Sequence, residues 1–179
     1  MTRILIVILL IGITMIGLNG LFTMNEKQQG LVLQFGEPKR VVQDSGLNFK
    51  IPLIQNVVRY DKRILEYDLP IEEVIAVDKK RMLIDSFTRF KITDPLEFYK
   101  TVGSESNVRN RLNSNVISSL RRVVGTVTLD ELLSEERSDI MERIRDEVNN
   151  EASRFGIKIV DVRIRRADLP EANSQAIYE

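Results

Sequence analysis

The side chains that perform most enzyme chemistry are missing from this sequence of 179 residues or stand isolated in it. It has no histidine and no cysteine, which excludes serine–histidine triads, thiol nucleophiles, iron–sulfur clusters and cysteine-ligated zinc. A serine–lysine pair can act without histidine, but no G-x-S-x-G, S-x-x-K or phosphate-loop pattern occurs. Ser86 stands among apolar neighbours, so a packed hydroxyl is a simpler interpretation than a nucleophile. We therefore expect no catalytic residue.

Carboxylates could still bind a metal ion or transfer protons, but their spacing in this sequence does not suit either role. Asp and Glu are scattered, and the conspicuous charged turn from Asp78 to Lys80 mixes both signs. Metal sites and proton transfer need several such groups to converge, so we expect no metal, no cofactor and no enzymatic activity. Lys+Arg and Asp+Glu are both 26, which disfavours a protein that binds nucleic acid by neutralising phosphates. Function is expected to lie in contact surfaces.

An uncharged apolar segment runs from Ile4 to Phe22, between Arg3 and Glu26. As a helix, its roughly 19 residues would span about 28 Å, close to the hydrocarbon thickness of about 30 Å. A helix also satisfies its own backbone hydrogen bonds in lipid. The sequence therefore predicts a transmembrane anchor. Its apolar residues are Ile4, Leu5, Ile6, Val7, Ile8, Leu9, Leu10, Ile11, Ile13, Met15, Ile16, Leu18, Leu21 and Phe22.

A cleaved signal peptide is the alternative to an uncleaved anchor. Its apolar region would be shorter and would precede a small-x-small cleavage site, and Leu18-Asn19-Gly20 is a poor match. We favour the anchor. Arg3 precedes the segment while Glu26 and Lys27 cancel after it, so the positive-inside tendency predicts a cytoplasmic N-terminus with the rest of the chain outside.

Apolar periodicity in the first part of the remaining chain predicts strands. In the clearest case, Arg81 to Ile92, Met82 and Ile84 are expected to face a core while Asp85 and Arg89 face water. In the strand ending at Arg166, Val160, Val162 and Ile164 are expected to face inward. In the strand at 30–36, Leu31, Leu33 and Phe35 are expected to share one face. The predicted strands are 30–36, 47–51, 57–64, 81–92 and 157–166.

The second part of the chain shows helical spacing. Apolar residues recur along two stripes, Leu112-Val116-Leu120-Val124 and Ile140-Ile144-Val148-Ala152 with Phe155. Thr128 followed by Glu131 resembles a capping box that begins a short helix, and Gly156 is a suitable helix stop. The predicted fold is α+β, a curved antiparallel sheet with two or three helices on one face. We place an anchor and short linker at 1–25, one domain at 26–168, and the start of a C-terminal helix at 169–179.

Several short blocks occur in an order that is typical of one family. They are GLVLQFG at 30–36, GLNFKIP at 46–52, YDKR at 60–63, VDKK at 77–80, IDSF at 84–87, DVRI at 161–164 and AIY at 176–178. With the N-terminal span, this order resembles the SPFH or band 7 family of stomatins, prohibitins, flotillins and the HflK and HflC subunits. The likeness is greatest to the HflC branch. It depends on the number and order of the blocks, since each alone is short.

The resemblance implies a scaffold without chemistry of its own. HflK and HflC subunits alternate in a cage around the membrane AAA protease FtsH and restrain its attack on membrane proteins. An HflK-like subunit, an FtsH-type protease and membrane lipids are thus the expected partners. The expected place is the bacterial inner membrane, with a single span, a cytoplasmic N-terminus and a periplasmic SPFH domain. The alternative is a stomatin- or prohibitin-like organiser of membrane domains without a protease partner.

Family members continue beyond the position of Tyr178 into a long coiled coil, whereas this sequence ends at Glu179. It is either a fragment or a shortened relative. Because ring closure in the family relies on those helices, the chain alone in detergent is expected to be a monomer or small oligomer.

Two surfaces are expected to make the contacts. An apolar loop that dips into the outer leaflet would use Leu47, Phe49, Ile51, Leu53 and Ile54. The alternative is that Leu47, Phe49 and Ile51 form the inner face of an ordinary core strand. A charged surface for neighbouring subunits would use Asp85, Arg89, Lys91, Asp161, Arg163 and Arg165. The alternative for this surface is an ordinary solvated sheet face.

Overall fold

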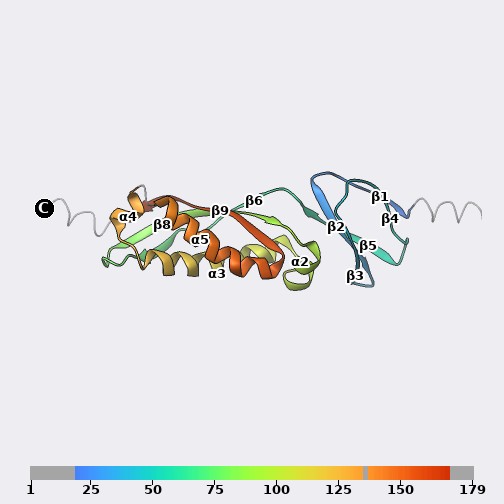
Figure 1. Ribbon diagram of the computed structural model, residues 1–179. Coiled ribbons are helices and arrows are strands. Elements are labelled where there is room, and N and C mark those ends of the chain that lie inside the picture. The colour runs from blue at the N-terminus through green and yellow to red at the C-terminus, as the bar shows by residue number, and fades with distance from the viewer. Residues whose placement is uncertain (1–18, 135–136, 170–179) are drawn as a thin grey trace, which may run out of the picture. The chain divides into compact units, whose positions relative to one another are not determined.

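The computed structural model describes residues 19–134 and 137–169 (Figure 1). The chain divides between Arg63 and Ile64 into two compact units, which we describe separately. The domain predicted at 26–168 includes residues of both units. The fold class is α+β as predicted, but the strands form three antiparallel sheets in place of one.

Most of the predicted anchor, residues 4–18, lies outside the described residues. Its last two residues, Leu21 and Phe22, belong to strand β1 (Leu21–Met24), so the predicted boundary was wrong there. Phe22 is buried among side chains of the first unit. Strand β1 thus extends to Met24, into the end of the segment at 1–25 predicted as anchor and short linker. Within the part of the chain that the structure describes, no helix is both long and apolar enough to cross a bilayer.

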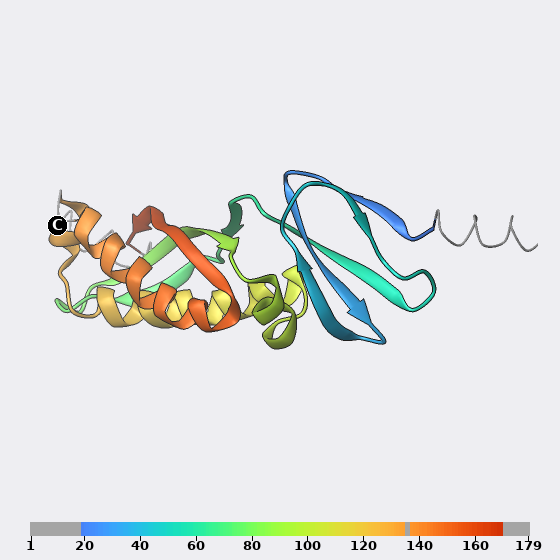
Figure 2. The ribbon, with the colours of Figure 1, turned by 45° about the vertical axis from the view of Figure 1, so that its right-hand side comes forward.

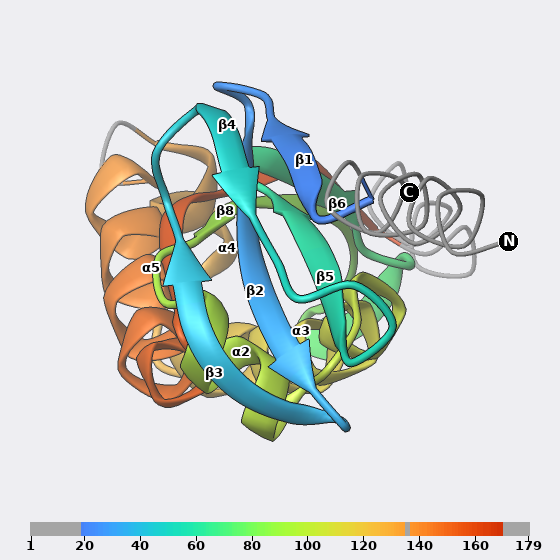
Figure 3. The ribbon, with the colours of Figure 1, turned by 90° about the vertical axis from the view of Figure 1, so that its right-hand side faces the viewer.

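The first unit consists of two small antiparallel sheets (Figure 3). Strand β1 pairs with β4 (Gly46–Phe49). In the other sheet β2 is central and its neighbours are β3 and β5; the three strands are β2 (Gln28–Gln34), β3 (Glu37–Val42) and β5 (Gln55–Asp61).

One hydrophobic cluster of the first unit consists of Phe22, Met24, Val32 and Val42, with Val57 packed against them. A Cβ at Gly30 would lie 2.9 Å from the Met24 side chain, so the missing side chain makes room for the methionine. The hydrophobic cluster joins the two small sheets, since Phe22 and Met24 come from β1 and Val32 and Val42 from the other sheet.

The β2–β3 hairpin corrects one predicted face. Phe35 and Gly36 both have positive φ, 51° and 87°, the backbone of a two-residue hairpin turn. Phe35 is therefore 84 % exposed, whereas the sequence placed it on a face with Leu31 and Leu33. The alternation of faces ends where the strand turns, and only Leu31 and Leu33 of the three are buried.

In the second unit the long strand β8 (Arg81–Ile92) is the centre of a four-stranded sheet. Strand β9 (Ile157–Asp168) pairs along one edge of β8. On the other edge β7 (Glu72–Ile75) pairs with residues 81–84 of β8 and β6 (Leu65–Asp68) pairs with residues 87–90.

The predicted alternation of β8 is confirmed, because Met82, Ile84, Phe90 and Ile92 are all buried. In β9 the prediction fails at one position. Arg89 pairs with Asp161 and Phe90 with Ile159, so Val160 is the extra residue of a β-bulge. Ile159 and Val162 are buried while Val160 is only half-buried. A second register shift lies between Asp85 and Ser86.

Two long helices, α3 (Glu105–Val124) and α5 (Arg137–Ala152), pack against each other and cover one face of this sheet (Figures 1 and 2). Both predicted stripes are buried except Phe155, which is half-buried. The capping box begins α4 (Leu129–Leu133), and Gly156 ends the 3-10 turn η1 (Ser153–Phe155) with φ 68°. The sequence did not predict α2 (Pro95–Thr101), which Asp94 caps.

Candidate interaction surfaces

Large apolar side chains are exposed at one end of the first unit. We call this set the apolar rim; it consists of Leu21, Phe35, Leu47, Phe49, Ile51, Leu53 and Ile54. Leu53 is 98 % exposed and Leu47 70 %. All five predicted loop residues are therefore on the surface, and the alternative that placed Leu47, Phe49 and Ile51 in a core strand is wrong.

The β1–β4 ribbon presents the first part of the rim. Leu21 lies opposite Phe49 in the register, and both side chains are exposed while Phe22 of the same strand is buried. The opposite face of the ribbon thus supplies the core. The Lys50 amide donates to the Gly20 carbonyl at 2.7 Å, which places the rim directly beside the last residues of the predicted span.

The segment after β4, residues 51–54, presents the second part of the apolar rim. The Ile51 amide donates to Gln55 Oε1 and the Gln55 amide donates to the Ile51 carbonyl, both at 2.9 Å. Between these bonds Leu53 has a positive φ of 67°, which is uncommon for a non-glycine residue. The segment is therefore a closed turn that leaves its apolar side chains in solvent.

Phe35 belongs to the same end of the unit. Gln34, which precedes it, pairs with Gln55 in the β2–β5 ladder, and their side-chain amides lie 3.3 Å apart. The β2–β3 turn and the 51–54 turn accordingly lie at one end in Figure 2. The sequence analysis missed Phe35 and Leu21 as surface residues, although the Phe-Gly pair between two β-rich runs was a usable sign of a turn.

On the second unit, the sheet face opposite the helices carries an aromatic ring between two guanidinium groups. Phe87 has Arg165 at 4.7 Å and Arg89 at 5.4 Å from its ring centroid. Arg89 Nε donates to Glu66 Oε2 at 2.9 Å, and Arg165 is paired with both Glu66 and Asp68. We call these five residues the arginine–phenylalanine cluster. Two of the three predicted arginines, Arg89 and Arg165, are thus held in fixed positions on one face.

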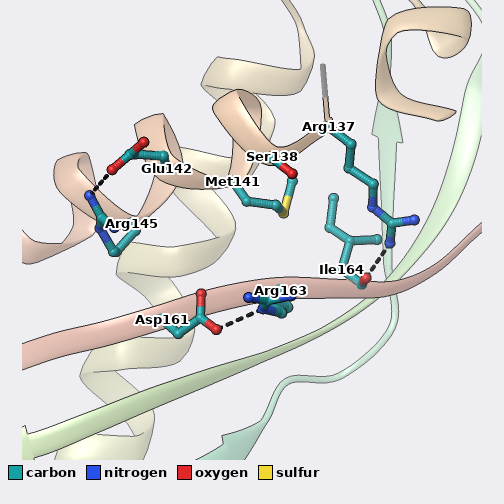
Figure 4. A pocket seen from close by; sticks show the side chains of 8 residues that line it. All are labelled: Arg137, Ser138, Met141, Glu142, Arg145, Asp161, Arg163 and Ile164. Carbon is teal, nitrogen blue, oxygen red and sulfur yellow. Dashed lines mark hydrogen bonds and ion pairs between the residues drawn. The ribbon is translucent and has the colours of Figure 1, made fainter. Parts of the chain in front are cut away.

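The other predicted contact residues lie around this cluster or beside it. Asp85 and Lys91 alternate with Arg89 on β8 and are half-buried. Asp161 pairs with Arg163 at 2.7 Å, and these two line a cavity of about 450 Å³ between α5 and β9 (Figure 4). The structure therefore brings Arg89 and Arg165 together and places Asp161 and Arg163 at the edge of the sheet.

The cavity shows no arrangement for catalysis. Arg145 bonds Glu142 at 2.6 Å, and Arg137 donates to the Ile164 carbonyl (Figure 4). The charged side chains that line the cavity thus pair with each other or with the backbone. In the described ranges, no three side chains of metal-ligating type come close enough to hold an ion.

Among the described residues, the pKa values of Asp61 and Asp78 are lowered, and both shifts favour the ionised form. Hydrogen bonds from the Arg63 side chain lower the pKa of Asp61, with a closest contact of 2.6 Å. Burial raises the pKa of Asp78, but the hydrogen bonds and charge of Lys80 outweigh it and the net shift is downward. Neither carboxyl group is thereby suited to act as an acid at neutral pH.

Comparison with known proteins points to one family. The model of the SPFH domain / Band 7 family matches residues 22–179. Protein HflC of Haemophilus influenzae is 30 % identical over 172 residues, which cover 90 % of this chain and 58 % of the relative. Protein HflC of Vibrio parahaemolyticus is 27 % identical, covering 99 % of the chain and 66 % of the relative.

A third relative has a more informative name. The Modulator of FtsH protease HflC of Escherichia coli K12 is 25 % identical over 204 residues, covering 88 % of the chain and 61 % of the relative. The chain thus spans less than two thirds of the length of these three relatives.

Proposed function

Because this chain belongs to the SPFH domain / Band 7 family, we propose that it is a membrane-anchored scaffold subunit that modulates an FtsH-type AAA protease. The observation that carries the proposal is the similarity over 88 % of the chain to a protein named Modulator of FtsH protease. In this proposal the protein assembles with an HflK-like subunit in a bacterial inner membrane. Residues 4–18 belong to its span, and the described units lie on the periplasmic side.

The apolar rim supports contact with the membrane. Folded proteins seldom leave a cluster of large apolar side chains in water unless it meets a partner or a lipid surface. The Lys50–Gly20 hydrogen bond brings the rim beside the end of the proposed span. Burying each rim side chain in the leaflet adds at most ~1.5–3 kcal/mol, so several together would hold the first unit against the bilayer.

The arginine–phenylalanine cluster supports contact with a neighbouring subunit. Arg89 and Arg165 are each about half-exposed and already ordered by Phe87 and Glu66. A neighbour therefore meets pre-positioned charges of both signs, which set register and partner choice more than affinity. Such a subunit acts by contact alone, without a catalytic step.

Recovery of partners from native membranes tests the proposal. The tagged chain is crosslinked in its membrane, solubilised and purified, and an Arg89→Glu/Arg165→Glu variant is the comparison. Co-purification of an HflK-like subunit and an AAA protease, reduced in the variant, supports the proposal. Recovery of the chain from the membrane fraction without either protein contradicts it and favours a general organiser of membrane domains.

A further inference from the structure

Basic side chains stand among the apolar side chains of the rim. Arg40 Nη2 donates to the Phe49 carbonyl at 2.7 Å, so its guanidinium is fixed beside the rim while its charge meets a neutral acceptor. Lys50 directly follows Phe49 in the chain. Lys39 lies close to the Phe35 turn and pairs with Glu37 at 3.1 Å. Glu37 offsets one of these three positive charges, so the rim carries a positive excess.

The other described carboxylates of the first unit, Glu26, Asp44 and Asp61, lie towards its opposite end. Asp61 is the partner of Gln28 at the start of β2, seven residues from the Phe35 turn. Glu26 precedes that end of β2, and Lys62 Nζ donates to the Gln43 carbonyl next to Asp44. Lys27, Lys62 and Arg63 balance these carboxylates, so that end is close to neutral while the apolar end carries a positive excess.

We infer that the rim recognises the anionic lipid headgroups of a bilayer surface, with Arg40, Lys50 and Lys39 at headgroup level and the apolar side chains below them. The inference depends on the proposed membrane contact of the first unit. Apolar burial and attraction to anionic lipid act together at such surfaces. Each basic side chain near an anionic leaflet strengthens binding by about fivefold, so the inserted state is favoured most where anionic lipid is abundant.

A lipid surface fits this patch better than a protein partner does. The Gly20–Lys50 hydrogen bond ties the rim to the point where the proposed span ends, so lipid is its nearest neighbour. The apolar side chains come from three separate segments at one end of the unit. The basic side chains of Arg40, Lys50 and Lys39 among them complement the phosphates of an acidic leaflet.

A single labelled residue can report insertion, because the chain has no cysteine and no tryptophan. The full chain with Leu53→Cys, carrying a polarity-sensitive dye, is reconstituted in vesicles of phosphatidylcholine alone or mixed with phosphatidylglycerol. Emission is expected to shift further to the blue in the anionic vesicles. High salt is expected to remove most of the difference, since the screening length falls from about 8 Å at physiological ionic strength to about 3 Å at 1 M salt.

Charge variants locate the effect. Lys50→Glu and Lys39→Glu, each in the labelled chain, are expected to lose the preference for anionic lipid, and Arg40→Gln to weaken it while a donor for the Phe49 carbonyl remains. The matched control is Lys27→Glu, the same charge change at the other end of β2. It lies roughly 20 Å away along the strand and is expected to keep the preference. Equal thermal unfolding by circular dichroism shows that the variants are folded.

The possible results distinguish the preference for anionic lipid from the proposed membrane contact of the first unit. A dye that stays in water in every vesicle overturns both the membrane contact and the inference. Equal insertion in neutral and anionic vesicles overturns only the inference. A blue shift that follows the protein-to-lipid ratio, whatever the lipid charge, assigns the rim to contact between copies and also overturns it.

Discussion

Gly156 is the residue whose identity is most tightly fixed by its surroundings. It has a φ of 68°, and a Cβ there would lie 2.3 Å from the Asp94 carbonyl oxygen and 2.9 Å from the Phe98 nitrogen. Its own carbonyl accepts the amides of Thr93 and Asp94 at 2.9 and 3.1 Å. This one residue therefore joins the end of β8, the start of α2 and the start of β9.

Gly156→Ala is expected to lower the free energy of unfolding by about 3 kcal/mol or more, since backbone strain and overlap with backbone atoms add. The control is Gly103→Ala, where φ is 80° but the nearest atom would be 3.7 Å away. There only the cost of the left-handed backbone remains, about 1–2 kcal/mol. Urea unfolding of both variants measures the difference, and equal losses would refute the steric explanation.

The Asp61–Arg63 pair gives a pH dependence of known sign. Hydrogen bonding to Arg63 lowers the pKa of Asp61, so the pair stabilises the fold above the ordinary carboxylate pKa and the contribution is lost as pH falls through the lowered value. Asp61→Asn is expected to cost less than about 1 kcal/mol at neutral pH, because Arg63 is exposed and solvent screens its charge. Unfolding curves of both proteins should converge in acid; a constant gap would contradict this.

At the level of the elements, the sequence predicted the long helices and strands that have one buried face. Strand β8 and helix α3 each repeat their buried side chains over several turns or alternations, so periodicity identifies them. Strands β1, β6 and β7 have four residues each, too few to show a period. Strand β3 contains Pro38, which normally argues against a strand. The bulge at Val160 depends on pairing with β8 and leaves no local pattern.

The predicted capping box is confirmed in its geometry. The Glu131 amide donates to Thr128 Oγ1 at 3.2 Å and the Thr128 amide donates to Glu131 Oε2 at 2.7 Å. Thr128→Ala removes one of the two bonds and is expected to cost about 1 kcal/mol. Thr128→Ser keeps a hydroxyl acceptor and is expected to cost less. Thermal unfolding of the two variants tests this, and an equal loss would show that the methyl group, not the cap, matters.

On the outer face of the β6–β8–β9 sheet, we expect a substitution to weaken binding while it leaves the stability of the fold nearly unchanged. Arg165→Ala removes a guanidinium over Phe87, but the group is 41 % exposed, so the free energy of unfolding should fall by less than about 1 kcal/mol. Crosslinking to the HflK-like neighbour should fall clearly. Arg165→Lys should rescue it only in part, because an ammonium lacks the planar fork. The control is Arg154→Ala on η1; an equal effect there would show that overall charge is the cause.

At the scale of the molecule, the surface at Leu47 to Ile54 could be proposed from the sequence but not decided by it. Alternation of Leu47, Phe49 and Ile51 fits a face turned to a core as well as one turned to lipid. The structure decides because β4 pairs with β1, whose Phe22 and Met24 already fill the core on the opposite face. The approach of both Arg89 and Arg165 to the Phe87 ring depends on long-range pairing of β8 with β9, which sequence spacing cannot show.

Degradation of a membrane protein in a reconstituted bilayer measures the proposed modulation most directly. Proteoliposomes hold an FtsH-type protease and its substrate, with or without this chain and an HflK-like subunit, and the substrate's half-life is followed in ATP. We predict that the half-life lengthens only when both subunits are present and shortens again with Arg89→Glu/Arg165→Glu. An unchanged half-life, with both subunits inserted and folded, would contradict the role as a protease-modulating scaffold.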